Sequence, residues 1–403
     1  MPNTLLTISM ITRKALQLFR NQNAFLQMID KQYDPQYAQT GAKIGDTLKL
    51  RLPLDYVIRT GPTAAPQDSV EKQVPLTISE YYGVDTTFSS IDLALSMDDF
   101  ASRVLEPMTN TLAGAVASKI MDGVENIPNF VHKVSGSATV SPDAATFLLA
   151  GAVLTQNCCP NVNRNLIVDP LTLSRVVSSL TGLFNPQNDI SKQYKTGLIR
   201  QNVLGFDWAD DNVVKLHTEG TFVSGTMNGA NQTGSTLTVT ATVGTLAVGD
   251  IITIAGVFQV NRVTKKSTGN LQQFVITAAA AAGSTTLSVY PPLNPQIGGL
   301  DKAYQTVTSS PTVNAAITTP VAAGEIYRKN FAFHPTACTM VSADLELPTG
   351  AVVSAGRSAY DGLSIRMTRD WNSTTDQWLT RMDFIFGSAW PRPEWAVIIA
   401  DAV

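Results

Sequence analysis

The chain is poor in the residues on which many protein classes depend. It has 3 cysteines and 3 histidines in 403 residues, and only 15% of its residues are charged. Cys158 and Cys159 are adjacent in the sequence and do not readily form an unstrained bridge with each other, so we expect a reducing compartment. A chain of this length buries a sizeable core without disulfides, which excludes a disulfide-stapled miniprotein.

Positive charge and long apolar runs are scarce as well. The 29 Lys and Arg residues stand against 32 Asp and Glu, for a net charge of -3, so no basic surplus exists to neutralise many phosphates. The sequence has no run of about 18 apolar residues that would predict a membrane span. Arg13, Lys14 and Arg20 interrupt the apolar N-terminus, so a secretory signal is not indicated. These absences favour a soluble intracellular protein without sequence-specific nucleic-acid binding.

Catalytic and ligand-binding patterns are also missing. His132, His217 and His334 lie far apart in the sequence, and no phosphate-binding glycine motif follows a predicted strand. His334 and Cys338 have a ligand-like spacing, but the second pair that a zinc site needs is absent and Pro335 disfavours a helix there. We therefore predict no enzyme, no catalytic residue, no cofactor and no metal site.

Apolar periodicity predicts helices in the first half of the chain. Residues 7–30 carry apolar side chains at three- and four-residue steps, which indicates an amphipathic N-terminal helix. Residues 91–124 predict the longest helix, and Pro107 should bend it or interrupt its hydrogen bonding.

Helix-start signals mark a helix, strand and helix unit further along. Ser141 as a cap and Pro142 at the first helical position predict a helix over 144–155. Residues 166–168 predict a short buried strand, and 171–180 a second helix.

Residues 41–88 predict an extended hairpin. Leu48, Leu50 and Leu52 alternate with charged residues in the two-residue period of a half-buried strand, and the pattern resumes at 74–78. The segment between them contains proline and glycine and is too polar for a core. We expect its tip to project into solvent or onto a partner.

A change in composition marks an insert. Only 6 of the 103 residues from 222 to 324 are charged, against 55 in the other 300. Short β-branched runs separated by glycines predict a small barrel or sandwich. They are residues 236–242, 251–254, 257–263, 274–277 and 287–290. Beyond the insert, ordinary charge density returns, and the apolar run 397–400 predicts a last strand that pairs back into the body.

Stretches in the second half of the chain carry a resemblance to a known family. The segment Tyr194–Asp207 resembles the one that precedes the inserted domain in major coat proteins of short-tailed, double-stranded DNA phages of the P22 type. Gly249–Val257 looks like a core strand and turn of that family's inserted β-barrel. Residues 362–365, 381–387 and 392–394 match the pattern near the coat protein's C-terminus.

The resemblance implies an α+β fold, the Hong Kong 97-type phage capsid fold with an inserted small β-barrel domain. The predicted hairpin, long helix and low-charge insert map onto it. The implied ranges are an N-terminal arm at 1–40, an extended loop at 41–88, a peripheral domain with a spine helix at 89–140, the first part of an axial domain at 141–221, the inserted domain at 222–325, and a C-terminal axial and peripheral part at 326–403.

The chain departs from the family at one loop of the insert. In the family a long charged loop before the Gly-Asp strand contacts a neighbouring capsomer. Here the comparable segment is the short, uncharged Met227–Gly234. We therefore expect another contact to substitute for that loop.

The resemblance also implies the function and the partners. The chain would be a major capsid protein, forming pentamers and hexamers of an icosahedral shell that encloses double-stranded DNA without sequence-specific binding. A scaffolding protein and a portal protein would take part, assembly would occur in the host cytoplasm, and the protein would reside in the virion capsid. Pro107 is a candidate hinge, and the predicted polar interface residues are Arg51, Asp55, Arg59 and Lys72.

Two other classes of function stay open on the residues alone. A β-rich phage tail or adhesion protein would bind a host surface through 222–325 and form small oligomers. An enzyme would need a cleft joining one histidine to a carboxylate and a nucleophile, and the spacing offers no support for one.

Overall fold

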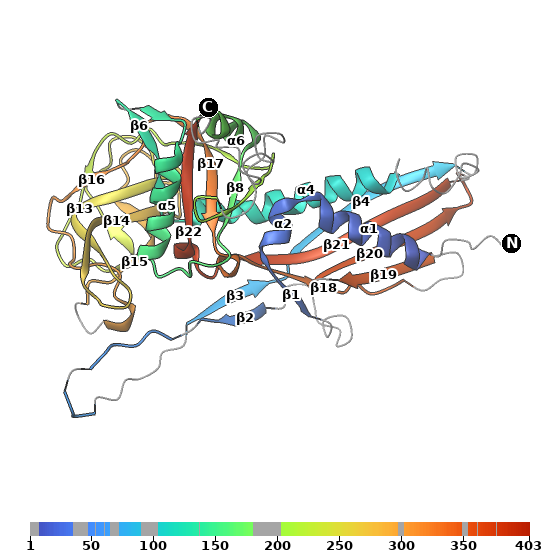
Figure 1. Cartoon of the computed structure of the whole chain (residues 1–403), viewed down its shortest axis with the longest axis horizontal. Helices are drawn as coiled ribbons and strands as arrows, with labels where there is room; N and C mark the ends of the chain where they lie inside the picture. Colours follow the sequence, from blue (N-terminus) through green and yellow to red (C-terminus); the bar gives the residue numbers. More distant parts are fainter. Residues whose placement is uncertain are drawn as a thin grey trace, which may run out of the picture. The chain divides into compact units, whose positions relative to one another are not determined.

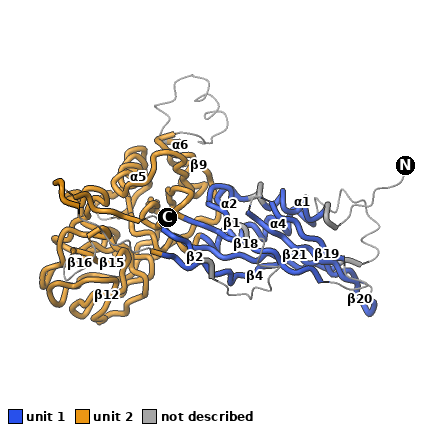
Figure 2. Tube along the Cα trace, turned by 90° about the horizontal axis from the view of Figure 1, so that it is seen from below, with its two compact units in different colours: residues 1–52, 73–120, 338–391 blue, residues 53–72, 121–337, 392–403 orange. Residues whose placement is uncertain are grey.

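The computed structural model describes most of the chain, in two compact units. The described residues are 8–34, 47–52, 54–59, 61–64, 72–89, 104–136, 138–179, 203–296, 302–348, 354–360, 362–375 and 377–403. Unit 1 comprises 1–52, 73–120 and 338–391, and unit 2 comprises 53–72, 121–337 and 392–403 (Figure 2). The six ranges implied by the resemblance are a finer division, and they remain predictions.

Unit 1 is built on an open sheet with helices packed along it (Figure 1). Its strand order is β1-β18-β21-β20-β19, with β4 also paired to β21. The strands are β1 (Asp30–Asp34), β4 (Glu80–Ser89), β18 (Thr339–Ala343), β19 (Ser354–Tyr360), β20 (Leu363–Asn372) and β21 (Gln377–Ala389). The helices are α1 (Ile8–Gln22), α2 (Ala24–Met28) and α4 (Glu106–Met121). The ring centroids of Phe19 on α1 and Phe384 on β21 are 5.2 Å apart, which places α1 on the sheet.

The N-terminal helix differs from its prediction at one position. The helical segment expected over 7–30 is divided at Asn23, whose side chain accepts a hydrogen bond of 3.0 Å from Leu26 N and caps α2. Asn competes for backbone hydrogen bonds and so favours a cap over a helix interior.

The predicted hairpin is confirmed between β2 (Thr47–Arg51) and β3 (Gln73–Thr77), which pair antiparallel with Thr47 opposite Thr77. The following residues, 80–89, form β4, which pairs along ten residues of β21 in the open sheet. Residues 80–88 were predicted as part of the extended loop at 41–88, but they belong to the open sheet. The paired strands of the hairpin are limited to 47–51 and 73–77.

The predicted long helix is described only in its second part. Residues 90–103 lie outside the described residues, so the expected helix start falls outside the structure's description. Pro107 is the second residue of α4, and the two described residues directly before this helix, Val104 and Leu105, are π-helical.

Unit 2 contains a six-stranded sheet with two helices packed on it, and we call this sheet the axial sheet. Its strand order is β5-β22-β17-β8-β9, with β10 also on β17. The strands are β5 (Phe130–Val131), β8 (Asn165–Val168), β9 (Asp207–Asp210), β10 (Leu216–Thr218), β17 (Ile326–Phe333) and β22 (Ala396–Ala402). The helices α5 (Ala144–Gln156) and α6 (Pro170–Ser179) bury Phe147, Leu154 and Val176 against this sheet. The last strand, β22, lies between β5 and β17. It therefore pairs back into the body of the protein, as predicted.

Both predicted helices of this unit are confirmed, but one cap is wrong. Asp143, not Ser141, is the N-cap of α5: its Oδ1 accepts from Thr146 N at 3.0 Å, and Thr146 completes a capping box. An acidic cap also complements the positive end of the helix dipole, which explains the choice of Asp143 over Ser141.

The low-charge region forms a second sheet in unit 2, with the order β11-β16-β13-β14-β15-β12. Its strands are β11 (Gly225–Thr226), β12 (Gly234–Thr238), β13 (Ile251–Val260), β14 (Ser267–Ile276), β15 (Thr286–Leu293) and β16 (Ala316–Thr318). Hydrogen bonds from Thr240 N to Thr226 O (2.8 Å) and from Asn228 N to Thr238 O (3.0 Å) join the two ends of this order. The sheet therefore closes on itself, and we call residues 222–318 the β-barrel. The two strands predicted at 251–254 and 257–263 are one strand, β13, with an irregular register between Thr253 and Phe258.

The chain enters and leaves the β-barrel at one place. β10 and β17 pair directly, and beyond them Glu219 N donates to Glu325 O (2.9 Å) and Gly324 N to Gly220 O (3.1 Å). A side chain at Gly220 would meet Thr245 O at 2.2 Å, so glycine is required where the two segments approach the barrel. We call residues 219–221 and 322–325 the neck. The α+β class predicted from the sequence is confirmed.

In the part of the chain that the structure describes, none of the helices combines the length and apolar character needed to cross a bilayer.

Candidate assembly interface

Asp55, at the base of the loop between β2 and β3, is held by an ion-pair chain within unit 2. The Arg262 guanidinium lies 2.8 Å from Asp55 Oδ2 and 3.0 Å from Glu394 Oε1. Tyr290 donates to the other Glu394 oxygen at 3.1 Å. Burial alone would lower the pKa of Arg262, but the carboxylates of Glu394 and Asp55 raise it overall. Arg262 therefore remains charged and fixes the loop base to the β-barrel.

The other predicted interface residues have different surroundings. The Lys72 ammonium lies 3.6 Å from the ring centroid of Tyr304, a cation–π contact in unit 2. Arg59 is exposed, and its guanidinium donates to the backbone oxygens of Gly61 and of Thr63, the latter at 2.9 Å. Arg51 is exposed at the end of β2 in unit 1. The structure thus brings Asp55 and Lys72 onto unit 2 and leaves Arg51 and Arg59 accessible.

The loop between Asp55 and Arg59 displays apolar side chains that the sequence analysis did not single out. Ile58 is 79% exposed and Tyr56 63% exposed. They line a cavity of about 290 Å³ whose other walls include Arg392 and Trp395. The guanidinium carbon Cζ of Arg392 lies 4.1 Å from the centroid of the Trp395 ring. Arg262, which holds the neighbouring Asp55, lies more than two hundred residues away in the sequence.

The uncharged turn at 227–234 is compact. The Gln232 amide donates to Thr238 O at 2.7 Å and to Asn228 O at 2.8 Å, and its oxygen accepts from Thr238 N at 2.7 Å. These bonds hold the turn against its own barrel. They agree with the expectation that it does not act as a long bridging loop.

Sequence reasoning missed a buried polar cluster beside the neck, formed by His217, Glu219 and Asp250. His217 Nε2 lies 2.8 Å from Asp250 Oδ1 and 3.9 Å from Glu219 Oε2. Burial, then the Asp250 carboxylate, raises the pKa of Glu219 to about 8. Burial also lowers the pKa of the neighbouring Lys329 to about 8. The spacing of residues in the sequence could not reveal this cluster. Asp250 comes from the β-barrel, whereas His217 lies on β10 and Glu219 in the neck.

Comparison with known proteins identifies the class. A family model described as "P22 coat protein - gene protein 5" matches residues 3–399, so the class is that of viral coat proteins. The chain belongs to the P22 coat protein family. It is therefore a major capsid protein, which forms the shell of a phage, as the resemblance implied. The match is to a coat protein and not to a tail or adhesion protein, which decides between those two alternatives.

Solved structures similar to the chain include phage structures of low sequence identity. The capsid of Ralstonia phage GP4 is 7% identical, with a TM-score of 0.47 over 93% of this chain and 87% of that one. A structure from Mycobacterium phage Che8 is 14% identical, with a TM-score of 0.45 over 94% of this chain and 91% of that one. The CUS-3 coat protein I-domain is 28% identical over 24% of this chain and 94% of the domain, with a TM-score of 0.20. None of the curated proteins compared matches this chain.

Membership of the coat protein family agrees with the Hong Kong 97-type capsid fold expected from the sequence. A coat protein is a structural protein, in line with the expectation that the chain is not an enzyme.

Proposed function

We propose that the chain assembles through pentamers and hexamers into an icosahedral shell around double-stranded DNA, with a scaffolding protein and with a portal protein at one vertex, in the host cytoplasm. The observation that carries this proposal is the family match over residues 3–399. The near-neutral balance of 29 basic and 32 acidic residues supports a wall that confines DNA without gripping it.

The loop between β2 and β3 is the proposed contact with a neighbouring subunit. Its base is fixed by Arg262 and Asp55, so the exposed Ile58 and Tyr56 are presented from a supported position. Arg59 lies beside them and supplies a cation that can pair across the contact. A modest contact of this kind, repeated at each subunit of a closed lattice, stabilises the whole shell.

The β-barrel is the proposed inserted domain, with bounds near 222–325. Support comes from its own apolar core, which includes Phe274, Ile252 and Val289, and from the pairing of β10 with β17, the strands that lead into and out of it. We propose that it helps the subunit fold and sets assembly geometry. Removing 222–325 and joining Thr221 to Ile326 should then abolish regular shells, whereas intact assembly without the insert would contradict this role.

Assembly itself is tested by negative-stain electron microscopy of the chain expressed alone and with its neighbouring open reading frames. Closed shells, regular or malformed, are the expected result. Monomers or small rings in every combination would contradict the proposal.

The loop contact is tested with paired variants. Ile58→Ser should leave the unassembled subunit folded, because Ile58 is solvent-exposed, but should reduce shell yield severalfold, whereas Ile58→Val should assemble normally. Arg59→Glu and Arg59→Lys form a second pair that separates charge from size. Equal shell yields for all four variants and the unchanged chain would remove the loop from the interface.

Pro107 remains the proposed hinge of the spine helix. Its place in the first turn of α4, directly after the π-helical pair, supports a change of direction there. Pro107→Ala should alter shell size or expansion, and unchanged shells would contradict the hinge.

A further inference from the structure

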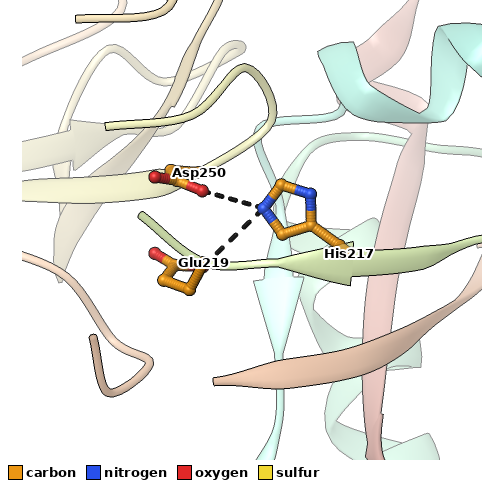
Figure 3. A group of neighbouring side chains, drawn as sticks. All are labelled: His217, Glu219 and Asp250. Carbon is orange, nitrogen blue, oxygen red and sulfur yellow. Dashed lines mark hydrogen bonds and ion pairs between the residues drawn. The ribbon is translucent and has the colours of Figure 1, made fainter. Parts of the chain in front are cut away.

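The cluster beside the neck gathers three ligand-type side chains in a buried space. His217 is 8% exposed, Glu219 3% and Asp250 0%. One potential ligand atom from each lies within 4.8 Å of the others. Figure 3 shows the His217 ring directed between the two carboxylates, with Asp250 arriving from the β-barrel.

We propose that His217, Glu219 and Asp250 form a binding site for a divalent cation of the zinc class, which ties the β-barrel to the axial sheet. One imidazole nitrogen and two carboxylate oxygens make a donor set that suits zinc, with bonds of about 2.0 to 2.2 Å. His217 Nε2 and Asp250 Oδ1 are hydrogen-bonded at 2.8 Å, and Glu219 Oε2 lies 3.9 Å from the same nitrogen; a bound cation would replace that hydrogen bond.

An unpartnered atom points to a missing ligand independently of this geometry. Among the residues that the structure describes, nothing hydrogen-bonds to the buried Glu219 Oε1. A buried polar atom left in this way is unfavourable, and a bound cation would satisfy it.

The charges around the cluster favour a cation as well. The carboxylates of Asp250 and Glu325 act on Glu219, and the ammonium of Lys329 is the opposing charge within the described part of the cluster. Lys329 donates to the backbone oxygen of Gly249 at 3.0 Å. A divalent cation bound here would stabilise the ionised carboxylates of Asp250 and Glu219.

Neighbouring groups hold the ligands in place. Asp250 Oδ2 accepts from Ala247 N at 2.7 Å and from Gly220 N at 3.1 Å, which fixes its other oxygen toward His217. Tyr327 donates to Glu219 Oε2 at 3.2 Å. Such outer partners orient the ligands of metal sites.

The test is a titration of the full-length chain, stripped with a chelator, with Zn²⁺ and with Co²⁺ as a spectroscopic probe. We expect one ion per chain by metal analysis after desalting, visible cobalt absorption, and a higher Tm with zinc. This measurement on the unchanged chain is decisive by itself: no bound ion and no shift of Tm at about 1 mM zinc, on the order of the weakest affinity of interest, would overturn the proposal.

Variants assign the ion to this cluster. Glu219→Gln preserves shape and should weaken binding more than the about 10- to 100-fold expected for the outer-partner variant Tyr327→Phe. His217→Gln should weaken binding likewise. The double variant His132→Gln, His334→Gln removes the other two histidines of the chain and should keep one ion. Equal binding by Glu219→Gln and the unchanged chain, or loss of the ion in the double variant, would overturn the site.

Discussion

The open sheet of unit 1 and the closed sheet of the β-barrel differ in where they bury a charged side chain. Within the described residues, Asp250 is the buried charged side chain of the barrel, and it lies at the neck rather than in the apolar core. The open sheet instead buries Asp383 between two guanidinium groups, with Arg366 Nη2 at 2.6 Å and Arg381 Nε at 2.7 Å.

The difference also extends to the sheet edges. The two ends of the barrel's strand order are joined by hydrogen bonds, whereas β19 ends the order of the open sheet. A closed sheet has no strand edge to offer, and an edge strand is a template for pairing with another chain. In the described part of the chain, the barrel thus closes on itself, whereas the sheet of unit 1 has β19 at its end.

The largest predicted effect tests the apolar core of the barrel. Phe274 is fully buried on β14, so Phe274→Ala should lower the free energy of unfolding by about 3 to 5 kcal/mol. Urea denaturation of the unassembled subunit measures this, with Phe274→Leu as a milder control. A decrease in the free energy of unfolding below about 1 kcal/mol would mean that the barrel core relaxes around the cavity. The apolar core would then not be what distinguishes the barrel from the sheet of unit 1.

The next effect tests the buried charge of the open sheet. Arg366→Met leaves the buried Asp383 with Arg381 as its remaining guanidinium partner, and should cost about 3 kcal/mol. Chemical denaturation of Arg366→Met and of Arg366→Lys, which keeps a cation, gives the size of the effect. If Arg366→Met were as stable as the unchanged chain, paired charge would not be what holds this sheet.

A smaller effect concerns the α5 cap, which belongs to neither sheet. Asp143→Ala should cost about 1 kcal/mol, and Asp143→Asn less because Asn also caps. The hydrogen bonds from Lys133 and then Thr146 lower the pKa of Asp143 from 3.8 to about 2. A lowered acid pKa stabilises the fold above pH 3.8, and this contribution disappears as pH falls through about 2. Stability measured from pH 6 to pH 2 should therefore show the difference between the unchanged chain and Asp143→Asn shrinking; a constant difference would contradict the assigned cause.

The smallest effect is expected at the surface of unit 1. Lys119 and Glu80 form a partly exposed pair at 3.4 Å, and Lys119→Gln should change stability by less than about 1 kcal/mol. Repeating the measurement in high salt is the check. A loss as large as that of Arg366→Met would show that burial does not distinguish the two ion pairs.

For the candidate interface, the sequence predicted where the loop lies but not which residues its side chains contact. The polar, proline- and glycine-bearing segment after Leu50 identified a loop, and Asp55 and Lys72 were correctly placed on it. Their partners, Arg262 and Tyr304, could not be predicted, because both are far away in the sequence and carry no motif.

The sequence by itself determined the local elements and the family. The start signals before α5 and α6, the alternation of β2 and the glycine-separated runs of the barrel depend on neighbours a few residues away, which the sequence shows directly. Tertiary structure alone decided the closure of the barrel, the Arg262 contact with Asp55 and the gathering of His217, Glu219 and Asp250. These depend on strand register and on the packing of distant segments, because a shift of one residue would turn each side chain to the opposite face of its sheet.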